Sequence, residues 1–393
     1  MNPGRLTRIL FAVALVLLPG LSAGCAPAPL VQVYGSKVPR FTDDLDRGSL
    51  KLAVRHSLDY LRRQPQQRKI MVAGHVYPLA RLTESLGFFL NLLADKPSAA
   101  ELNTLIRRYF DVFQATGTGG FNPGRKMLVT GYYQPVFSGS LTRQGPFQHP
   151  LYSVPDDLVR QDNPAGGKRA VGRIVAGHLV PYWTRREIEL LHKAAGHELV
   201  WLKDPFEAFI LQVQGSGLIR LQDGSLRGVH FAAGNGRRYR SIGRYLVATK
   251  RLTLAKANMT TIRDYIAAHP GERDEILNYN KSFIFFKWSR TPGAVGSLGE
   301  ELTAGRSIAV DLGCFPAGAL GFLVTRQPAP AGEGAGGWTR LKRLVLAQDT
   351  GSAIRGPGRV DLFWGAGPEA GRLAGRMKET GSLYFLLLRR RVK

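Results

Sequence analysis

The sequence predicts a mainly β protein with added helices, divided into more than one domain, and three observations support this prediction. A chain of 393 residues exceeds what one compact core usually holds, so two domains, or three, are expected. Helical periodicity dominates before residue 115, whereas short apolar runs separated by Gly, Pro and polar turns dominate after residue 126. Helical patterns return at residues 242–268 before the β pattern resumes. This order fits one domain inserted within another, and it fits domains in series equally well.

Composition restricts the class of protein and the kind of partner. Hydrophobic residues at 44% and charged residues at 21% exclude wholesale disorder and collagen-like structure. The 54 Lys and Arg against 29 Asp and Glu give a formal net charge of +25. Such a charge favours an anionic partner, which is nucleic acid, an anionic lipid surface or an acidic polymer. Two cysteines exclude a disulfide framework, and no apolar run beyond residue 30 is long enough for a polytopic membrane protein.

Residues 1–25 predict an export signal. Arg5 and Arg8 precede an apolar run at residues 9–21, and small residues follow it. The run ends Ser22-Ala23-Gly24-Cys25, which is similar to a bacterial lipoprotein signal in which Cys25 carries the lipid. Ser22 stands where such signals usually have an apolar residue, so ordinary cleavage that releases a soluble protein remains the alternative.

Both outcomes export the mature chain. We expect a periplasmic protein, attached to the outer membrane if Cys25 is lipidated. Export argues against nucleic acid as the anionic partner and leaves cell-wall polymer and membrane surface. Cys314 would then lack a disulfide partner, so it is expected to be a small buried apolar residue.

The first part of the mature chain is expected to be a tether followed by helices. Residues 26–44 are assigned to the tether. Ser49 is expected to cap a helix whose apolar face carries Leu50, Val54, Leu58 and Leu61. A second helix is expected at residues 79–94. Ser98 and Glu101 form a capping-box signature for a third helix, and the helical segment is expected to end near Gln114.

The remaining elements are expected to be mostly strands. Strands are expected at residues 127–133, 209–214, 218–221, 307–311, 320–325, 344–349, 360–364 and 383–388. Asp223-Gly224 is a hairpin-type turn between two of the apolar runs. Helices are expected at residues 242–250 and 260–268, and residues 327–337, rich in Pro, Ala and Gly, are expected to form a surface loop.

Carboxylates are the main catalytic candidates, because other site patterns are missing. The eight histidines include no His-x-x-x-His or His-Glu-x-x-His pair, so no protein metal site is expected. Neither a Gly-x-Ser-x-Gly elbow nor a phosphate-binding Gly-rich loop with Lys-Ser/Thr occurs. Asp349-Thr350-Gly351-Ser352 spells the aspartic-protease signature, but that chemistry needs a second copy and the chain has none.

Three aspartates in the last hundred residues lie at the ends of apolar runs. They are Asp311, Asp349 and Asp361, and small residues after Asp349 allow a backbone or ligand to approach closely. The alternative is structural, because aspartates at strand ends commonly accept hydrogen bonds from turn amides.

Residues 344–371, LVLAQDTGSAIRGPGRVDLFWGAGPEAG, closely resemble the three-aspartate domain of the membrane-bound lytic murein transglycosylase A family. Asp311, Asp349 and Asp361 fall at the three aspartate positions of that family. Further matching blocks are TGYYQP from Thr130, PFEAFILQVQGSG from Pro205, YRSIG from Tyr239, NKSFIFF from Asn280 and GSLG from Gly296. The resemblance covers roughly residues 130–388, with the blocks in the family's order.

The resemblance implies the architecture. It implies a double-psi β-barrel domain carrying N-terminal helices, a smaller β-rich domain inserted into it, and a glycan groove between the two. Mapped onto this chain, the barrel domain takes residues 45–135 and 237–393, and the insert takes residues 136–236.

The resemblance also implies the reaction. Lytic transglycosylases cleave the β-1,4 bond between N-acetylmuramic acid and N-acetylglucosamine of peptidoglycan. The muramyl 6-hydroxyl attacks its own anomeric carbon and gives 1,6-anhydro-N-acetylmuramic acid, so the substrate supplies the nucleophile. One carboxyl can then protonate the leaving oxygen and afterwards accept the hydroxyl proton. No cofactor and no metal is expected.

The family pattern assigns that acid to Asp361, with Asp349 as its electrostatic and hydrogen-bonding partner and Asp311 as a more distant support. The roles of Asp361 and Asp349 could be exchanged. Glycan contacts are expected from amide, aromatic and small residues of the matching blocks: Tyr132, Tyr133, Gln134, Gln212, Gln214, Gly215, Ser216 and Gly217. For each tyrosine the alternative is core packing.

The expected partners are peptidoglycan glycan strands and, through the lipid anchor, a membrane. Two other functions stay open at this point. One is a peptidoglycan-binding module without activity. The other is a true hydrolase that uses Asp349 as its second carboxyl.

Overall fold

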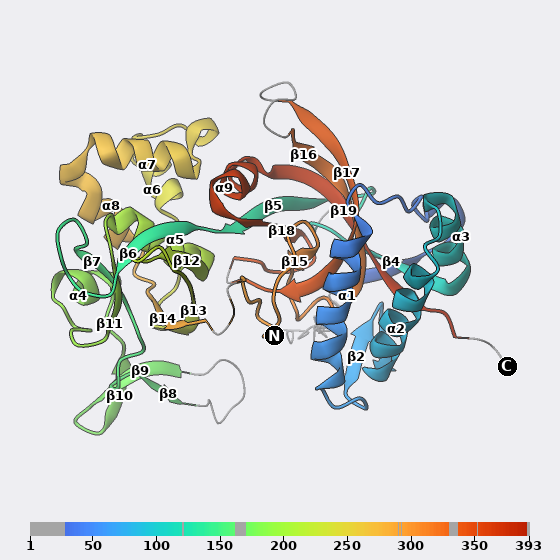
Figure 1. Ribbon diagram of the computed structural model, residues 1–393, viewed down its shortest axis with the longest axis horizontal. Helices are drawn as coiled ribbons and strands as arrows, with labels where there is room; N and C mark the ends of the chain where they lie inside the picture. The colour runs from blue at the N-terminus through green and yellow to red at the C-terminus, as the bar shows by residue number, and fades with distance from the viewer. Residues whose placement is uncertain are drawn as a thin grey trace, which may run out of the picture.

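The computed structural model describes residues 28–119, 122–161, 170–289, 291, 293–329, 337–351 and 353–390. The expected export signal and Cys25 lie outside the described residues, as does most of the expected loop at 327–337. Figure 1 shows two lobes, with helices α1–α3 and the longest strands in one and helices α4–α8 in the other.

The described helices are α1 Arg47–Arg62, α2 Ala80–Ala94, α3 Ala99–Tyr109, α4 Arg185–Leu190, α5 Pro205–Gln214, α6 Ile242–Ala248, α7 Met259–Ala268, α8 Arg273–Tyr279 and α9 Gly367–Arg376, with short 3-10 turns at Gly35–Lys37, Leu254–Lys256 and Pro270–Glu272. The described strands are β1 Leu30–Val33, β2 Lys69–Val72, β3 His75–Pro78, β4 Phe110–Ala115, β5 Met127–Gln134, β6 Val136–Ser140, β7 His149–Tyr152, β8 Val159–Gln161, β9 Ala170–Val175, β10 His178–Pro181, β11 Glu198–Leu202, β12 Ser216–Arg220, β13 Leu226–Gly234, β14 Ile284–Trp288, β15 Ser307–Ala309, β16 Leu320–Pro328, β17 Trp338–Asp349, β18 Arg359–Ala366 and β19 Lys378–Leu388.

The larger sheet holds eight described strands in the order β1-β4-β19-β16-β17-β15-β18-β5. Because β19 also pairs with β5, the pairings among β19, β16, β17, β15, β18 and β5 form a closed ring. Two of the strand pairs in this ring, β15–β17 and β18–β5, are parallel. Apolar side chains from these strands, including Val129, Ile308, Val360 and Leu362, lie in the main core with those of α1 and α2.

The N-terminal helices largely follow the sequence pattern. Leu50, Val54, Leu58 and Leu61 are all buried on α1, as expected. The expected cap of α1 is wrong, because Asp46 is the N-cap and its side chain accepts the backbone N–H of Ser49. Helix α2 begins within one residue of the expected position, and the capping box at the start of α3 is present.

The helical segment ends earlier than expected. Helix α3 stops at Tyr109, and residues 110–115 form strand β4. This strand pairs with β19 on one side and β1 on the other, and Val112 and Phe113 are buried in the main core. The apolar residues that looked like a continuing helix face are therefore placed by sheet pairing, which local periodicity does not reveal.

The described part of the expected tether is packed rather than loose. Strand β1 pairs with β4, and Phe41 is buried against Phe322 with their ring centroids 5.0 Å apart. The expected tether is therefore wrong for residues 30–44, because β1 adds a backbone ladder and Phe41 adds a buried aromatic contact.

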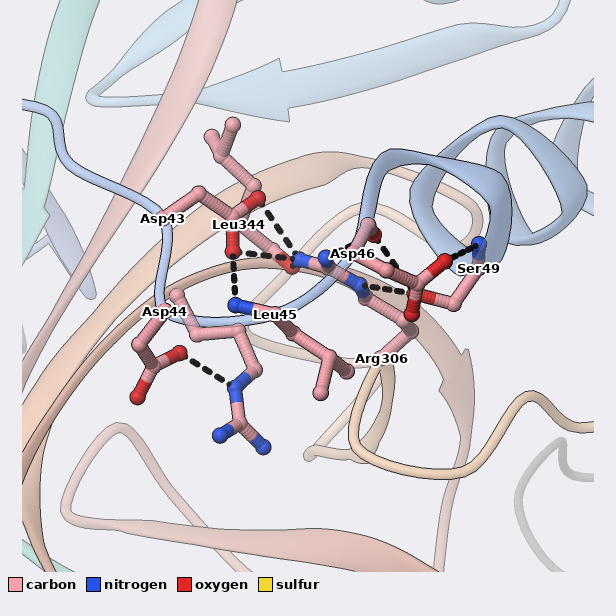
Figure 2. A network of polar contacts seen from close by, with 8 residues as sticks. Asp43, Asp44, Leu45, Asp46, Ser49, Arg306 and Leu344 are labelled. Atoms are coloured by element: carbon pink, nitrogen blue, oxygen red, sulfur yellow. Dashed lines mark hydrogen bonds and ion pairs between the residues drawn. The ribbon is translucent and has the colours of Figure 1, made fainter. Parts of the chain in front are cut away.

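A buried arginine fixes this N-terminal segment to the sheet (Figure 2). The side chain of Arg306 is fully buried, and its Nη1 donates to both carboxylate oxygens of Asp43 at 2.8 and 2.7 Å and to the carbonyl of Leu344 at 2.9 Å. Its Nε donates to Ser49 Oγ at 3.0 Å, and its Nη2 donates to the carbonyl of Asp46 at 2.7 Å. One guanidinium thus joins the start of α1 to β15 and β17.

The second lobe contains a six-stranded described sheet in the order β14-β13-β12-β6-β11-β7. Strand β5 of the larger sheet leads into β6 of this sheet (Figure 1), and the chain returns to the larger sheet between β14 and β15. Strand β14 belongs to this sheet, although its residues lie beyond 236, the expected end of the insert. Strands β8, β9 and β10 form a separate small sheet.

The strand expected at residues 209–214 is wrong, because these residues lie in α5. The side chain of Asp204 accepts the N–H of Phe206, and Pro205 occupies the first helical position. Apolar residues of α5 belong to two different cores, with Leu211 in one and Phe209 in the other. A helix buried on more than one side loses the polar face that identifies an amphipathic helix.

Two further points complete the fold. Helix α9 occupies residues 367–376, for which the sequence analysis expected no element. Cys314 is half-buried against the main core with a free thiol, and burial raises its pKa.

Across the part of the chain that the structure describes, no helix combines the length and apolar character needed to cross a bilayer.

Replacing Arg306 with Met should lower the free energy of unfolding by about 3–5 kcal/mol, because Asp43 would remain partly buried without its cation. Urea denaturation would measure this. As a control, Arg273→Ala removes a solvent-exposed pair with Asp274 and should change stability by less than about 1 kcal/mol. Equal effects of the two substitutions would contradict a stabilising role for the buried guanidinium.

Candidate active site

The short strand β15 places Asp349 and Asp361 on its two sides. Ala309 pairs with Asp361 across the antiparallel ladder to β18 and with Asp349 across the parallel ladder to β17. Since neighbouring strands lie about 4.8 Å apart, the two aspartate backbones are separated by about 10 Å. Two of the three sequence-predicted aspartates therefore lie in one part of the sheet.

Asp361 is a largely buried carboxyl with its side chain 15% exposed. Its Oδ1 accepts hydrogen bonds from the hydroxyl of Thr130 and from Nε of Arg359, the latter at 3.3 Å. Burial raises the pKa of Asp361, while the charge of Arg359 and the two hydrogen bonds oppose that rise. The net direction is upward, so the group keeps its proton to a higher pH than an ordinary aspartate.

Asp349 has different surroundings. Its Oδ1 accepts the backbone N–H groups of Ser297 and Thr350, both at 2.8 Å, and its Oδ2 accepts the hydroxyl of Tyr132 at 3.0 Å. Burial raises the pKa of Asp349 above its ordinary value, and these donors oppose that rise without reversing it. Three donors to one carboxyl match the hydrogen-bonding capacity of the ionised form.

Asp311 has a structural position. Its Oδ1 accepts the N–H of Gly313 at 2.9 Å, and its Oδ2 accepts the N–H of Gly356 at 2.7 Å. The second bond ties the end of β15 to the segment between Asp349 and Asp361. Asp311 thus bonds to loop amides, as the structural alternative for these aspartates anticipates.

Neighbouring tyrosines of β5 point to opposite faces. Tyr132 packs on Phe363, with ring centroids 5.2 Å apart, and donates to Asp349. Burial, Asp349 and Asp361 together raise the pKa of Tyr132 well above its ordinary value, so its hydroxyl remains a donor. Tyr133 instead lies against α9, where a Cβ added at Gly371 would come within 2.8 Å of its ring.

The other expected glycan contacts are spread over the second lobe and its junction. Gln134 is buried at the end of β5. Gln212 is buried on α5, where its Oε1 accepts from Arg185 and its Nε2 has no partner. Gln214, Gly215, Ser216 and Gly217 form the turn from α5 into β12, and Gly215 has the positive φ of 81° that ends the helix. The structure therefore brings Tyr132 to the aspartates and leaves Gln212 within the packed insert.

Sequence reasoning missed three residues that shape the site, which are Thr130, Ser297 and Tyr239. Thr130 and Arg359 contact Asp361, and Ser297 contacts Asp349 through its backbone. Tyr239 lies in the loop after β13. Burial raises the pKa of Tyr239, and the nearby charge of Arg359 opposes this rise. The matching blocks contain Thr130, Ser297 and Tyr239, but only the fold shows which carboxyl each one serves.

In the part of the chain that the structure describes, these carboxyls belong to no metal-binding group and lie outside the lining of a large surface pocket. Within the described ranges, no group of three or more His, Cys, Asp or Glu side chains is arranged to hold a metal ion. A surface pocket of about 520 Å³ is lined by Gln66, Pro78, Ala80, Arg81, Thr83, Glu84 and Arg390, none of which contacts the aspartates. The candidate site is therefore formed by the carboxyls and their donors.

Comparison with known proteins identifies the family. Residues 128–287 match the MltA specific insert domain, and residues 306–387 match the 3D domain. The chain is 32% identical over 278 residues to membrane-bound lytic murein transglycosylase A of Escherichia coli K12, covering 70% of this chain and 69% of the relative. The chain belongs to the membrane-bound lytic murein transglycosylase A family.

Solved structures agree with this assignment. The membrane-bound lytic murein transglycosylase of Agrobacterium tumefaciens superposes with a TM-score of 0.74 at 28% identity, covering 91% of this chain and 97% of that one. MltA of Neisseria gonorrhoeae gives a TM-score of 0.70 at 29% identity, covering 92% and 96%. This member of the MltA family is accordingly an enzyme, a lytic transglycosylase.

Replacing Tyr132 with Phe should lower kcat by roughly 10-fold with little change in KM, because Asp349 loses one donor while the ring packing stays. Steady-state kinetics on purified murein would measure this. Tyr133→Phe is the matched control, since that ring lies on the other face of β5, and it should retain near-normal kcat. A similar fall in both variants would argue against a specific role for the Tyr132 hydroxyl.

Proposed function

We propose that this enzyme cleaves the β-1,4 bond between N-acetylmuramic acid and N-acetylglucosamine of peptidoglycan and forms 1,6-anhydro-N-acetylmuramic acid. The family supports action on murein, since its curated members are named lytic murein transglycosylases. The observation that carries the mechanism is the contrast between two buried carboxyls. Asp361 accepts hydrogen bonds from Thr130 and Arg359, whereas Asp349 accepts three, two of them from backbone amides.

In the proposed mechanism, protonated Asp361 donates its proton to the glycosidic oxygen as the bond to the anomeric carbon breaks. The muramyl 6-hydroxyl then attacks that carbon from within the same sugar, so no water enters and the nucleophile has a high effective concentration. The Asp361 carboxylate accepts the proton of the 6-hydroxyl, which returns the acid to its starting state. The proton that Asp361 gives to the glycosidic oxygen is thus replaced by the proton of the 6-hydroxyl within one cycle.

Asp349 is proposed to remain ionised and to stabilise positive charge that develops at the anomeric carbon. Its three donors favour the carboxylate form. Burial, and not the charge of Asp349, raises the pKa of Asp361. Burial raises the pKa of both carboxyls, so the assignment of Asp361 as the acid is supported by the larger number of donors to Asp349 and by the family pattern, not by the pKa directions.

The glycan is proposed to lie along the face of β5 that carries Thr130, Tyr132 and Gln134. Alternation along a strand places these three side chains on one face, and Thr130 contacts Asp361 there. Gln134 and Ser216 remain proposed glycan contacts, and Tyr132 is proposed to act by holding Asp349.

We also propose the finer architecture. The closed ring of six described strands with two parallel pairs supports a double-psi β-barrel as the catalytic domain. The second sheet ends with β14, so we place the insert at about residues 136–288 rather than 136–236. The family name "membrane-bound" and the N-terminal signal pattern support a cell-envelope lipoprotein attached through Cys25, at the outer membrane.

Replacing Asp361 with Asn should lower the cleavage rate by roughly 100- to 10,000-fold, because the amide cannot supply the proton. Mass spectrometry of digested murein should show anhydro products from the wild type, each one water lighter than a reducing end. Purely reducing ends would instead identify a hydrolase, and absence of any product would identify a binding module. Asp361→Asn should still sediment with intact murein sacculi, which separates lost chemistry from lost folding.

Replacing Arg359 with Gln should move the alkaline limb of the kcat/KM profile to higher pH. The charge of Arg359 lowers the pKa of Asp361, so its removal lets the acid stay protonated at higher pH. A pH–rate profile would measure the shift. Arg355→Gln is the control, since Arg355 is exposed on the same segment, and it should leave the limb in place. A shift to lower pH in Arg359→Gln would reject Asp361 as the acid.

Replacing Cys25 with Ser should release the protein from the membrane fraction, because the lipid attachment atom is removed. Fractionation of cells that produce each form would measure this. Unchanged membrane association of Cys25→Ser would rule out lipid anchoring at this cysteine.

A further inference from the structure

One face of the second sheet carries polar side chains near the junction with β5, while farther along β14 the same face is covered where Phe285 is buried in a separate core. Val229, Ile219 and Phe286 lie on the other face, buried in a core that includes residues of α5. Alternation therefore places Ser216, His230 and Lys287 on the face away from that core. Figure 1 shows β12, β13 and β14 beside the junction where β5 passes into β6.

Strand register aligns four polar side chains in one row on this face. Ser216 pairs with His230 across β12–β13, and His230 pairs with Lys287 across β13–β14. Leu218 pairs with Val136, so continuing this parallel register places Ser216 beside Gln134. Neighbours in such a row have Cβ atoms about 4.5–5.5 Å apart.

The row lies at a distance from the catalytic aspartate that a polymer can span. Gln134 follows Thr130, the contact of Asp361, by four residues, which is about 13 Å along a strand. Lys287 lies three strands across from there, about a further 14 Å. A glycan strand held at Asp361 would need several sugars to reach Lys287.

Two members of the row have polar atoms without protein partners. His230 is partly buried, and its Nδ1 is shielded from solvent without a hydrogen-bond partner among the described residues. Lys287 is exposed and forms no ion pair within the described ranges. Burial and the charge of Lys287 lower the pKa of His230, so its imidazole is neutral near neutral pH and has one N–H to donate. An ammonium beside a neutral imidazole offers donors suited to an anion.

We propose that His230 and Lys287 form a distal subsite that binds a carboxylate carried by a muramyl residue several sugars from the bond that is cleaved. This inference rests on the proposed function, because it assumes that the glycan passes Asp361. The sugar rings of murein are uncharged, so its carboxylates lie on the lactyl groups, where the peptide has been removed, or on the attached peptides. A single subsite of this kind makes the enzyme favour anionic strands over neutral β-1,4 glycans of equal length.

The experiment compares three ligands on wild type and Lys287→Gln. The ligands are peptide-substituted glycan strands, strands stripped of peptide by an amidase that leaves the lactyl carboxylate, and chitohexaose, which has no carboxylate. Each binding constant is measured on the Asp361→Asn background, which prevents turnover. Lys281→Gln is the charge-matched control, since Lys281 is exposed and precedes the same strand.

Lys287→Gln should weaken binding of a carboxylate-bearing strand by roughly 5- to 10-fold and leave chitohexaose binding unchanged. Weakening only with the stripped strands identifies the lactyl carboxylate, weakening only with peptide-substituted strands identifies a peptide carboxylate, and weakening with both shows that the subsite accepts either carboxylate. Equal binding of all ligands by variant and wild type overturns the subsite, and so does equal weakening with chitohexaose. His230→Gln should act in the same direction.

Failure of the underlying function is distinguishable from failure of the subsite. If the enzyme with Asp361 intact gives no anhydro products, the proposed reaction fails whatever the binding constants show. If anhydro products form and Lys287→Gln binds every ligand normally, only the subsite fails. Thermal melting of each variant confirms folding, and Lys287→Gln is the informative variant because its side chain is exposed.

Discussion

The geometry of this enzyme depends on the position of β15, a strand of three residues between two carboxyl-bearing strands. Ala309 faces Asp361 on one side and Asp349 on the other, so a shift of β15 would separate the pair. Arg306 immediately precedes this strand and is bonded to Asp43, Ser49 and Leu344. Buried polar contacts thus fix the strand that positions Asp361 and Asp349. These contacts specify one position of β15 relative to its neighbours. Some buried ion pairs are known to fix the register of packed elements in this way.

A second buried network fixes β17 in the same region. The hydroxyl of Ser307 donates to Gln348 Oε1 at 2.6 Å, and Gln348 Nε2 donates to the carbonyl of Ala53 at 2.9 Å and to Ser57 Oγ at 3.1 Å. Gln348 directly precedes Asp349. Since all of these groups are satisfied, the network adds rigidity next to the carboxyl without leaving an unpaired polar atom. Helix α1 therefore supports the site without contributing a residue to it.

The two carboxyls differ because their neighbours differ. Backbone amides and a tyrosine surround Asp349, whereas Asp361 has a threonine and an arginine. Both are buried, so burial alone cannot assign their roles. The donors around Asp349 favour the charged form, and the burial of Asp361 favours the protonated form. One sheet in this way holds two buried carboxyls with different donors about two strands apart.

Blocks of matching residues were enough to predict the family and the three aspartate positions, and local alternation of apolar residues was enough to predict most strands of the larger sheet. The sequence also determined the capping box of α3 from Ser98 and Glu101 alone. Tertiary structure decided that residues 110–115 pair as β4, that residues 205–214 are helical, and that residues 30–44 pack on the body. Each of these depends on a partner distant in sequence: β19 for β4, two separate cores for α5, and Phe322 for Phe41. The same holds for the site, since only strand register placed Tyr132 on Asp349 and Thr130 on Asp361, and no spacing in the sequence encodes which strands become neighbours.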